Sequence, residues 1–450
     1  MTYVSRRFYG WRIVGVLAVT ETVSWGILYY AFSVFMVPMR HDLGLSAASI
    51  SAAFSVALIV MGVSALAVGR WLDRHGGRAL MTTGSVLAVG VVAAWSQVRE
   101  TWQVYAVFAA LGVAGAMVLY EPAFAVVVRW FDRQRARALL VVTLVAGFAS
   151  TIFVPTAAAL EQSVGWRDAL LVLAGVLAVT TVLPHALVLR RDPADLGLAP
   201  DGDGPPRPRA PVEESSTLTA TSREMWAEPR FRWLTLAFAL HTLAIIGVSV
   251  HLFPFLREQG HGVGFAAGVT GALGALSVTG RLVVTGLFAR MATMRVTSGV
   301  FALQAAAAVV LLAAPASTTA AVVFVLLFGL GFGVGTIARP ALVVEAYGVA
   351  RYATVSALMG LALSASKVVG PVAVGVSRTT TGGYTTALAA LVAVTLASAL
   401  ALRAAHRSSD HAGSGKPPQP SSSSTIEDTA SRAGRPTPIN VAEAGPVQSP

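Results

Sequence analysis

Two cations interrupt otherwise apolar segments of this chain and are its first candidates for chemistry. Arg281 and Lys367 each lie within a long run of hydrophobic residues. An ionisable side chain in hydrocarbon costs about 2.5–3.5 kcal/mol on insertion scales, so such residues are functional candidates by default. Two like charges in one cavity repel each other, and a bridging anion relieves that repulsion. The pair predicts a site for an anionic substrate, with a structural ion pair to a buried acid as the alternative.

Composition distinguishes Lys367 further. Of the 33 basic residues 31 are Arg, and the second Lys, Lys416, lies in a polar C-terminal stretch. Lys is a compact charge whose protonation responds to desolvation, whereas Arg stays charged. A single Lys among apolar residues therefore suits binding of a small anion or release of a proton. Arg281 has a further alternative, because a cation near a helix end can extend to the membrane surface.

Four other ionisable residues in apolar segments are candidates for carrying a coupling proton: Glu21, Glu121, His241 and His251. Hydrocarbon favours the neutral form of a carboxyl group, so Glu21 is either a protonation site or the partner of a buried cation. A neutral His either satisfies a hydrogen bond in a core or relays a proton.

Aromatic side chains accompany these groups. Trp25, Tyr29 and Tyr30 follow Glu21 along one segment, and Tyr120 lies in another. We expect Tyr29, Tyr30 and Tyr120 to line the substrate cavity, with ordinary packing as the alternative.

The elements that position these residues are membrane spans. The chain has 450 residues, of which 55% are hydrophobic and only 12% charged, with a mean hydropathy of +0.68. Soluble chains carry about 25% charged residues, so a soluble enzyme, a nucleic-acid-binding protein and a secreted disulfide scaffold are excluded. A span needs roughly 20 apolar residues. Twelve segments qualify: 11–38, 46–69, 79–97, 102–128, 138–160, 167–189, 232–256, 263–289, 296–314, 318–344, 352–376 and 382–403.

Arginine placement predicts the orientation. With the N-terminus inside, inner loops and helix ends carry nineteen arginines and outer loops carry five. Positive residues accumulate on the cytoplasmic side. Both termini and the central loop are therefore expected in the cytoplasm, in the plasma membrane of a bacterium, since the Arg- and Ala-rich composition suggests a high-GC genome.

The spans divide into two similar sets. We expect an N-terminal six-helix bundle at 1–190, a cytoplasmic linker at 191–230, a C-terminal six-helix bundle at 231–404 and a disordered tail at 405–450. Pro122 and Pro340 are 218 residues apart, close to the separation of other landmarks in the two halves. Glu121 and Arg339 precede these prolines, so they are either a structural or gating pair between the halves or two independent groups. Parallel repeats of this kind build secondary transporters.

The loop after the second span carries a motif, Gly69-Arg70-Trp71-Leu72-Asp73-Arg74-His75-Gly76-Gly77-Arg78. It resembles the G-x-x-x-D-R-x-G-R-[RK] signature of the major facilitator superfamily, with Gly77 in place of one Arg. The matching residues are Gly69, Asp73, Arg74, Gly76 and Arg78. We expect Gly69 to let two helix ends approach closely and Asp73 to face an Arg or a helix N-terminus.

Two further segments resemble the monocarboxylate transporter and oxalate–formate antiporter branch of that superfamily. They are Phe8-Tyr9-Gly10-Trp11, before the first span, and Trp130-Phe131-Asp132-Arg133, after the fourth. The first lacks the usual acidic residue. The resemblance implies an all-α membrane protein of twelve helices in two six-helix pseudo-repeats. It also implies, by position, that Arg281 and Lys367 hold the substrate carboxylate.

The sequence thus predicts a secondary transporter, and not an enzyme, for a small organic anion such as a mono- or dicarboxylate. Coupling to a proton or a counter-anion is expected, in a monomer that needs no cofactor, metal or nucleic acid. The alternative within the same fold is an exporter of hydrophobic drugs or metabolites.

Overall fold

The computed structural model describes residues 8–202 and 218–414. Within these ranges the side chains of Leu66, Asp73 and residues 218–222, 349–350, 352–354, 357 and 409–414 are excluded from the description. Most of the expected tail and the middle of the expected linker lie outside the described residues. The described part of the chain is built of helices joined by short turns, without a strand.

The first half of the chain forms the elements α1 to α9. They are α1 (Tyr9–Trp25), the π-helical turn η1 (Gly26–Tyr30), α2 (Ala31–Leu43), α3 (Ala47–His75), α4 (Gly77–Ser96), α5 (Thr101–Val118), α6 (Tyr120–Trp130), α7 (Arg135–Ala146), α8 (Ala149–Leu177), a second π turn η2 (Ala178–Val182) and α9 (Leu183–Val188).

The second half begins after the short 3₁₀ turns η3 (Pro193–Leu196) and η4 (Pro200–Gly202). It contains α10 (Leu218–Ala227), α11 (Pro229–Glu258), α12 (Val263–Phe288), α13 (Thr293–Ala313), α14 (Thr318–Phe332), α15 (Gly335–Thr381) and α16 (Thr385–Ser414). The last helix continues past the expected end of its span at 403.

Ten described helices are long and apolar enough to cross a membrane, or eleven if the bent pair α14 and Gly335–Gly348 is one span. One of the ten, Arg135–Val188, has 54 residues, which at about 1.5 Å per residue is more than twice the hydrocarbon thickness. It is broken at Gly165, where φ is 79° and ψ is 162°. Counting both sides of this break is consistent with the twelve predicted spans.

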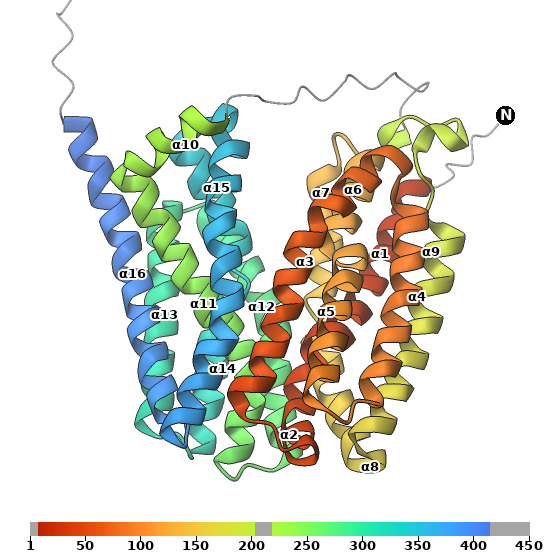
Figure 1. The fold of residues 1–450 in the computed structure, drawn as a ribbon. Helices are drawn as coiled ribbons and strands as arrows, with labels where there is room; N and C mark the ends of the chain where they lie inside the picture. Colours follow the sequence, from red (N-terminus) through yellow and green to blue (C-terminus); the bar gives the residue numbers. More distant parts are fainter. Residues whose placement is uncertain (1–7, 203–217, 415–450) are drawn as a thin grey trace, which may run out of the picture. The chain divides into compact units, whose positions relative to one another are not determined.

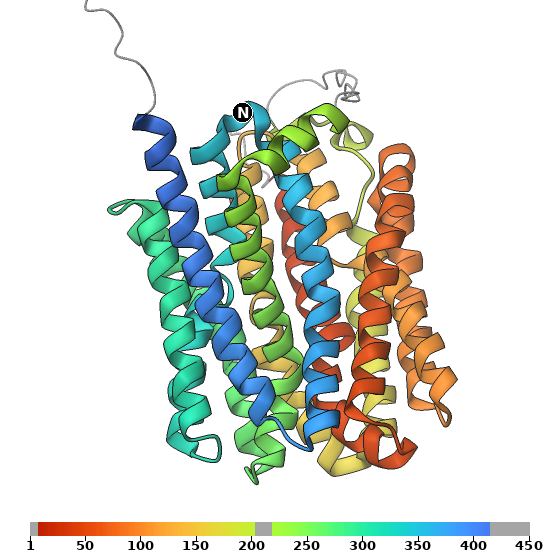
Figure 2. The same cartoon turned by 60° about the vertical axis from the view of Figure 1, so that its left-hand side comes forward.

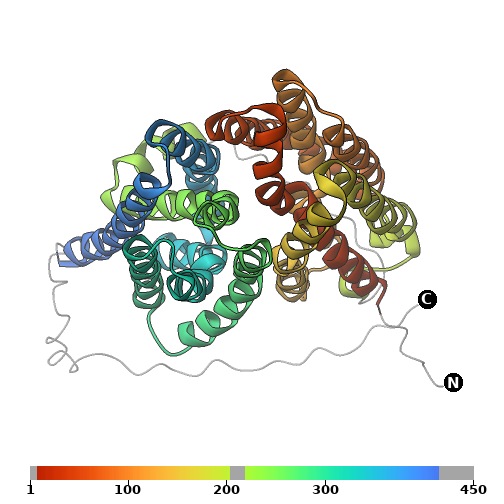
Figure 3. The same cartoon turned by 90° about the horizontal axis from the view of Figure 1, so that it is seen from below.

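The helices form two groups side by side, α1–α9 and α11–α16 (Figure 1, and from below in Figure 3). We call the end that carries α10 the linker end and the opposite one the far end. In Figures 1 and 2, α3 and α15 lie close together at the far end and diverge toward the linker end.

Hydrogen bonds between the two halves follow two seams. In the first, between α3 and α15, the Thr379 hydroxyl accepts from the Ala48 N–H at 3.1 Å and the Ser55 hydroxyl donates to the Val368 carbonyl at 2.7 Å. In the second, between α8 and α12, the Thr151 hydroxyl donates to the Gly271 carbonyl at 2.8 Å. In membranes, packing and interhelical hydrogen bonds take the place of the hydrophobic effect between helices.

The segments Phe8–Trp11 and Trp130–Arg133 pack against each other at the linker end. The Phe8 ring centroid lies 5.5 Å from that of Phe131, and the Trp11 centroid 5.1 Å from it. The linker adds Asp201, whose carboxylate accepts hydrogen bonds from the backbone N–H groups of residues 132, 133 and 134. These contacts join the N-terminal segment, the loop after α6 and the start of the linker.

The break at Gly165 gives a prediction for stability. Gly165→Ala places a Cβ on a residue with positive φ, which costs roughly 1–2 kcal/mol. Gly175→Ala, in the regular part of α8, meets no atom within 4 Å and should stabilise the helix by about 0.5–1 kcal/mol. Thermal unfolding in detergent should therefore show a lower midpoint for Gly165→Ala and an equal or higher one for Gly175→Ala. Equal midpoints for the two variants would contradict the positive φ at Gly165.

Candidate functional site

A cavity of about 200 Å³ lies between the two halves of the bundle. The first half contributes aromatic and apolar side chains, including Trp25 and Met61, and the second half contributes cations and hydroxyl groups. The five residues predicted to bind substrate all line this one cavity: Tyr29, Tyr30, Tyr120, Arg281 and Lys367.

Arg281 reaches across the seam between α12 and the first half. Its Nη1 donates to the Thr143 carbonyl oxygen at 3.1 Å, and its Nη2 donates to the Ser277 hydroxyl at 3.0 Å. Its Nε is buried and has no partner among the described residues. The guanidinium is thus held in place by two bonds and keeps hydrogen-bonding capacity for a ligand.

Lys367 lies on α15 and is exposed at the cavity, although protein surrounds it on most sides. Its ammonium group interacts favourably with Glu121 and unfavourably with Arg339. The sequence predicted buried cations, but Arg281 and Arg339 are half-buried and Lys367 is exposed. The physical reason is solvation, because intramembrane charges face an aqueous cavity when they lack a partner.

Glu121 and Arg339 do not form the direct pair that was one of the two predictions for them. Within the described part of the chain, the ion pairs found with a nitrogen–oxygen distance of 4 Å or less do not include these two residues. Each interacts instead with Lys367, and Glu121 is itself exposed.

A π-helical turn brings the aromatic residues to the cavity. Hydrogen bonding in a π turn runs from residue i to i+5, so Tyr30 follows Trp25 on nearly the same face of the helix. Tyr29 packs between them, with ring centroids 5.3 Å from Trp25 and 5.0 Å from Tyr30. The turn starts at Gly26, against which Phe153 packs so closely that a Cβ would lie 2.2 Å from its ring.

Glu21 lies one turn before Trp25 and does not line the cavity. Its side chain is fully buried, and neither carboxylate oxygen has a hydrogen-bond partner among the described residues. The side chains that interact with it are the Trp25 indole and Glu121, an acid. The predicted alternative, pairing with a buried cation, is therefore absent from this structure.

The two histidines of α11 are not among the residues that line the cavity. His241 stacks on Phe301 with centroids 4.4 Å apart, inside the second half. His251 lies at the far end, where Nε2 is 3.0 Å from the Pro371 carbonyl oxygen and 3.3 Å from the Ser51 hydroxyl. A carbonyl only accepts, so Nε2 carries the proton.

The hydrogen bond at the other ring nitrogen of His251 supports a proton on Nε2. Nδ1 lies 3.2 Å from the Tyr384 hydroxyl. Burial raises the pKa of that hydroxyl, so Tyr384 stays protonated and donates. His251 therefore joins α3 of the first half to the second half through one neutral ring.

The signature loop after α3 is tied to the rest of the first half. The Arg78 Nε donates to the Ala186 carbonyl at 2.8 Å, and Arg191 donates to the Arg74 carbonyl at 2.8 Å. Gly76 has φ of 78°. The Asp73 side chain lies outside the described residues.

The expected role of Gly69 in close helix approach is wrong. A Cβ at Gly69 would meet no described atom within 4 Å, whereas one at Gly77 would lie 2.3 Å from Val126. The close contact therefore falls at the position where this chain departs from the signature, because α4 begins there against α6.

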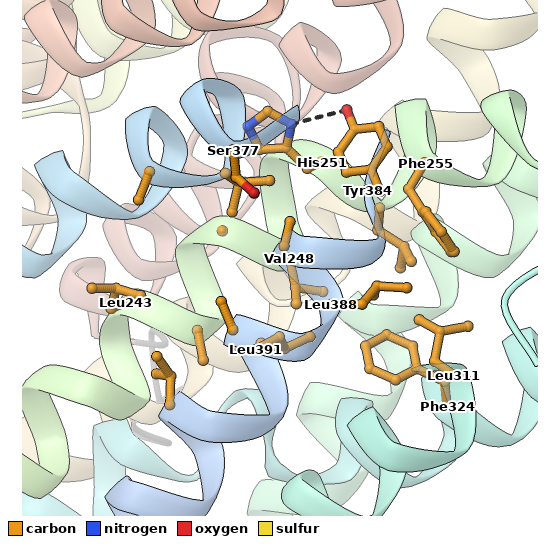
Figure 4. Close-up of a pocket in the computed structure, with 18 residues that line it drawn as sticks. Leu243, Val248, His251, Phe255, Leu311, Phe324, Ser377, Tyr384, Leu388 and Leu391 are labelled. Atoms are coloured by element: carbon orange, nitrogen blue, oxygen red, sulfur yellow. Dashed lines mark hydrogen bonds between the residues drawn. The ribbon is translucent and has the colours of Figure 1, made fainter. Parts of the chain in front are cut away.

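A second cavity, of about 240 Å³, lies within the second half among α11, α13, α14, α15 and α16 (Figure 4). Its described lining is apolar except at one end, where His251, Ser377 and Tyr384 lie. No cation lines its described part, so the central cavity is the better candidate for an anion.

A helical membrane bundle with a polar cavity between two halves has the architecture of a secondary transporter. Residues 18–371 match the Major Facilitator Superfamily, and the chain belongs to this family. With its apolar helices it is a multi-pass membrane protein of this transporter family.

Solved structures show the same fold. A point mutant of the nucleoside transporter NupG superposes with a TM-score of 0.71 at 13% identity, over 88% of this chain and 99% of that one. A bacterial homologue of the human lysosomal transporter Spinster, described as inward-facing, gives 0.69 at 14% identity, over 90% and 98%.

Among curated relatives, human monocarboxylate transporter 11 is 25% identical over 282 residues, which is 62% of this chain and 56% of that protein. An MFS-type efflux pump of Mycolicibacterium smegmatis is 33% identical over 177 residues, 38% of this chain and 40% of that one. The chain spans about half the length of the curated relatives that it matches.

Sequence reasoning missed the hydroxyl groups of the cavity: Ser249, Ser277 and Thr336. Ser277 was accessible from the sequence, because it lies four residues before Arg281 and such residues share a helix face. The other two carry no signal that separates them from ordinary serines and threonines of apolar helices.

The π turn can be tested through its glycine. Gly26→Ala should lower the free energy of unfolding by about 1–3 kcal/mol, because overpacking displaces Phe153. Gly15→Ala, earlier in α1, meets nothing within 4 Å and serves as the control. Without the Phe153 ring there is nothing to overpack. Gly26→Ala should therefore lower the midpoint of thermal unfolding less in a Phe153→Ala background than in the wild-type protein. If Gly26→Ala and Gly15→Ala unfold alike, the proposed packing at η1 is incorrect.

Proposed function

We propose that this protein is a secondary active transporter that moves a small organic anion, a mono- or dicarboxylate, by alternating access. The observation that carries the proposal is that Arg281 and Lys367, from two helices of the second half, line one cavity between the halves. Arg339 adds a third cation beside Lys367. Glu121 offsets one of these charges at most, so an anion is the ligand that this cavity favours.

The similarity to proteins named monocarboxylate transporters supports the same substrate class. Each of these relatives is distant, at 24–26% identity, and the match covers only part of each. The support from similarity is therefore secondary to the charges in the cavity.

For the coupling ion we propose a proton carried by Glu21, with Glu121 as its route to the cavity. Glu21 is fully buried without a hydrogen-bond partner among the described residues, an environment that favours the neutral form. Glu121 interacts with both Glu21 and Lys367. Exchange against a second anion is the alternative mode. His241 and His251 were candidates from the sequence, and they are secondary because neither lines the cavity.

We place the protein in the bacterial plasma membrane as a monomer, with both termini and the linker in the cytoplasm. The arginine distribution supports this orientation. With it, the far end of the bundle faces the outside of the cell.

In this orientation the contacts of Ser51 and His251 act as the outer gate. On the same seam, a Cβ at Gly375 would lie 2.7 Å from the Ser51 hydroxyl oxygen and 2.8 Å from the Ala47 carbonyl oxygen. Rocking of the halves would break these contacts and open the cavity to the outside.

Export of hydrophobic drugs or metabolites is the second candidate. The similarity to an efflux pump and the apolar part of the cavity lining favour it. Arg281 and Lys367 would then be structural, and a deletion strain would become sensitive to lipophilic compounds while its growth on organic acids stayed unchanged.

The anion site is tested by uptake into proteoliposomes of labelled lactate, pyruvate, formate and oxalate. Loss of a hydrogen bond to a charged group costs about 1.5–3 kcal/mol, so Arg281→Ala and Lys367→Ala should each reduce uptake by roughly ten- to a hundredfold. Arg290→Ala removes an exposed cation from the same end of α12, outside the cavity, and should leave uptake unchanged. Wild-type rates in both cavity variants would show that the site assignment is wrong.

The gate is tested by thiol labelling, because the chain contains no Cys. Ser249→Cys places one thiol at the cavity, and Gly375→Ala in that background should separate α3 from α15 at the far end. We expect labelling by a membrane-impermeant maleimide from outside to rise about threefold or more, as closed states lose about 1 kcal/mol or more of packing. Gly360→Ala, on the same helix with nothing within 4 Å, is the matched control. Unchanged labelling in Gly375→Ala would show that the seam between α3 and α15 is not part of the gate.

A further inference from the structure

The wall that the first half gives to the central cavity is aromatic. Trp25, Tyr29 and Tyr30 come from α1 and η1, and Tyr120 comes from the start of α6. The rings touch one another in a series, since Trp25 lies 5.0 Å from Tyr120 and 5.3 Å from Tyr29 between centroids. They form one continuous surface, which we call the aromatic wall.

The groups that can bind a carboxylate all come from the second half. Arg281 and Lys367 supply positive charge, and the Ser277 hydroxyl, which accepts from Arg281, keeps its own proton to donate. The hydroxyls of Ser249 and Thr336 also line the cavity, but they donate to the carbonyls of Ile245 and Gly333. The cations of the cavity therefore come from the second half and the four clustered aromatic rings from the first, while Ile245, Ile246 and Phe332 of the second half add apolar lining.

Two polar atoms on the aromatic wall, the Tyr29 hydroxyl and the Trp25 indole N–H, are buried without a hydrogen bond of 3.5 Å or less to a described residue. The Tyr29 side chain is 8% exposed, and Ser249 is the polar group closest to bonding with its hydroxyl, without meeting hydrogen-bond geometry. Buried hydroxyl groups in folded proteins are normally satisfied. An unsatisfied one that lines a cavity points to a ligand beside this wall.

We propose that the substrate is an aromatic monocarboxylate, whose carboxylate binds at Arg281 and Lys367 while its ring packs on the aromatic wall. This rests on the proposed function and narrows it. Aromatic rings prefer offset or edge-to-face contact with other rings, and their faces are negative. The wall therefore favours a second ring.

The same surface selects against the small acids. The second carboxylate of oxalate would meet the negative faces of Trp25 and Tyr120 and lose its hydration. Formate and lactate would contact the cations but leave the wall uncovered. A substrate with one charged end and one aromatic end satisfies both sides of the cavity.

The experiment uses the full-length protein and a matched set of probes: phenylacetate, cyclohexylacetate, lactate, formate and oxalate. Dissociation constants come from ligand-dependent thermal stabilisation, and transport from uptake of the labelled acids into proteoliposomes. Phenylacetate should bind at least about tenfold more tightly than lactate, formate or oxalate, and more tightly than cyclohexylacetate.

The outcomes separate this inference from the proposed function. If lactate, formate or oxalate binds and is transported as well as phenylacetate, the protein is an organic-anion transporter and the aromatic inference is overturned. If cyclohexylacetate matches phenylacetate, the wall selects bulk and the inference is likewise overturned. If none of the acids binds or is transported, the proposed function itself fails.

Variants test the wall directly. Tyr120→Leu should reduce the preference for phenylacetate over lactate at least about fivefold, while Tyr120→Phe keeps the ring and should keep the preference. Phe124→Leu is the matched control, because Phe124 stacks on Tyr120 at 5.0 Å without lining the cavity. An unchanged preference in Tyr120→Leu, or an equal loss in Phe124→Leu, overturns the proposal. If Tyr120→Leu does not fold, the same comparison is made at Trp25: Trp25→Leu removes the ring and Trp25→Phe keeps one.

Discussion

A charge within a membrane protein must be solvated or paired, and the position of Arg281 and Lys367 follows from this constraint. Arg281 places two of its donors on the Thr143 carbonyl and the Ser277 hydroxyl. Lys367 keeps its side chain exposed and interacts with Glu121. Neither cation could be enclosed in hydrocarbon without the cost that insertion scales assign to it. In a two-bundle fold, the seam between the halves is where both cations can meet water. The cations therefore need the cavity for their solvation, and the cavity owes its positive charge to them.

The remaining contacts between the halves suit surfaces that separate and rejoin. They include hydroxyl groups, backbone carbonyls and glycines, as at Ser51 with Gly375 and Thr151 with Gly271. Such groups allow close approach and interhelical hydrogen bonding, and parting them leaves no charge in hydrocarbon. The bond from Arg281 to Thr143 differs, because it joins a cavity cation to the opposite half. An anion at Arg281 would compete with this carbonyl, which offers a physical link between occupancy of the site and the position of the halves.

The fold could be predicted from the sequence because hydrophobic segments and arginine placement report directly on the membrane. The site could be predicted in part, since a charge in an apolar run is conspicuous. The exposure of these cations could not be predicted, because the period of a helix does not show which of its faces meets a cavity. The expectation that the cations would be buried was wrong for this reason. The π turn at Gly26–Tyr30 has no signature of its own, and it changes which rings share a face. His251 was conspicuous as a polar residue, yet its hydrogen bonds to α3 and to Tyr384 arise only from tertiary packing.

The two halves have similar arrangements of helices but carry different charged residues at equivalent positions. One such difference lies beside Lys367, at the proposed site. Glu121 and Arg339 occupy equivalent positions before Pro122 and Pro340, with opposite charge, and both act on Lys367. A symmetric pair of cations would only repel the ammonium group, and a symmetric pair of acids would neutralise it and remove its attraction for an anion. Arg339 and Lys367 both belong to α15, so a rigid rotation of the halves leaves them together and changes only the separation of Lys367 from Glu121 on α6. Approach to Glu121 would weaken the hold of Lys367 on the proposed anion, and separation from it would strengthen that hold.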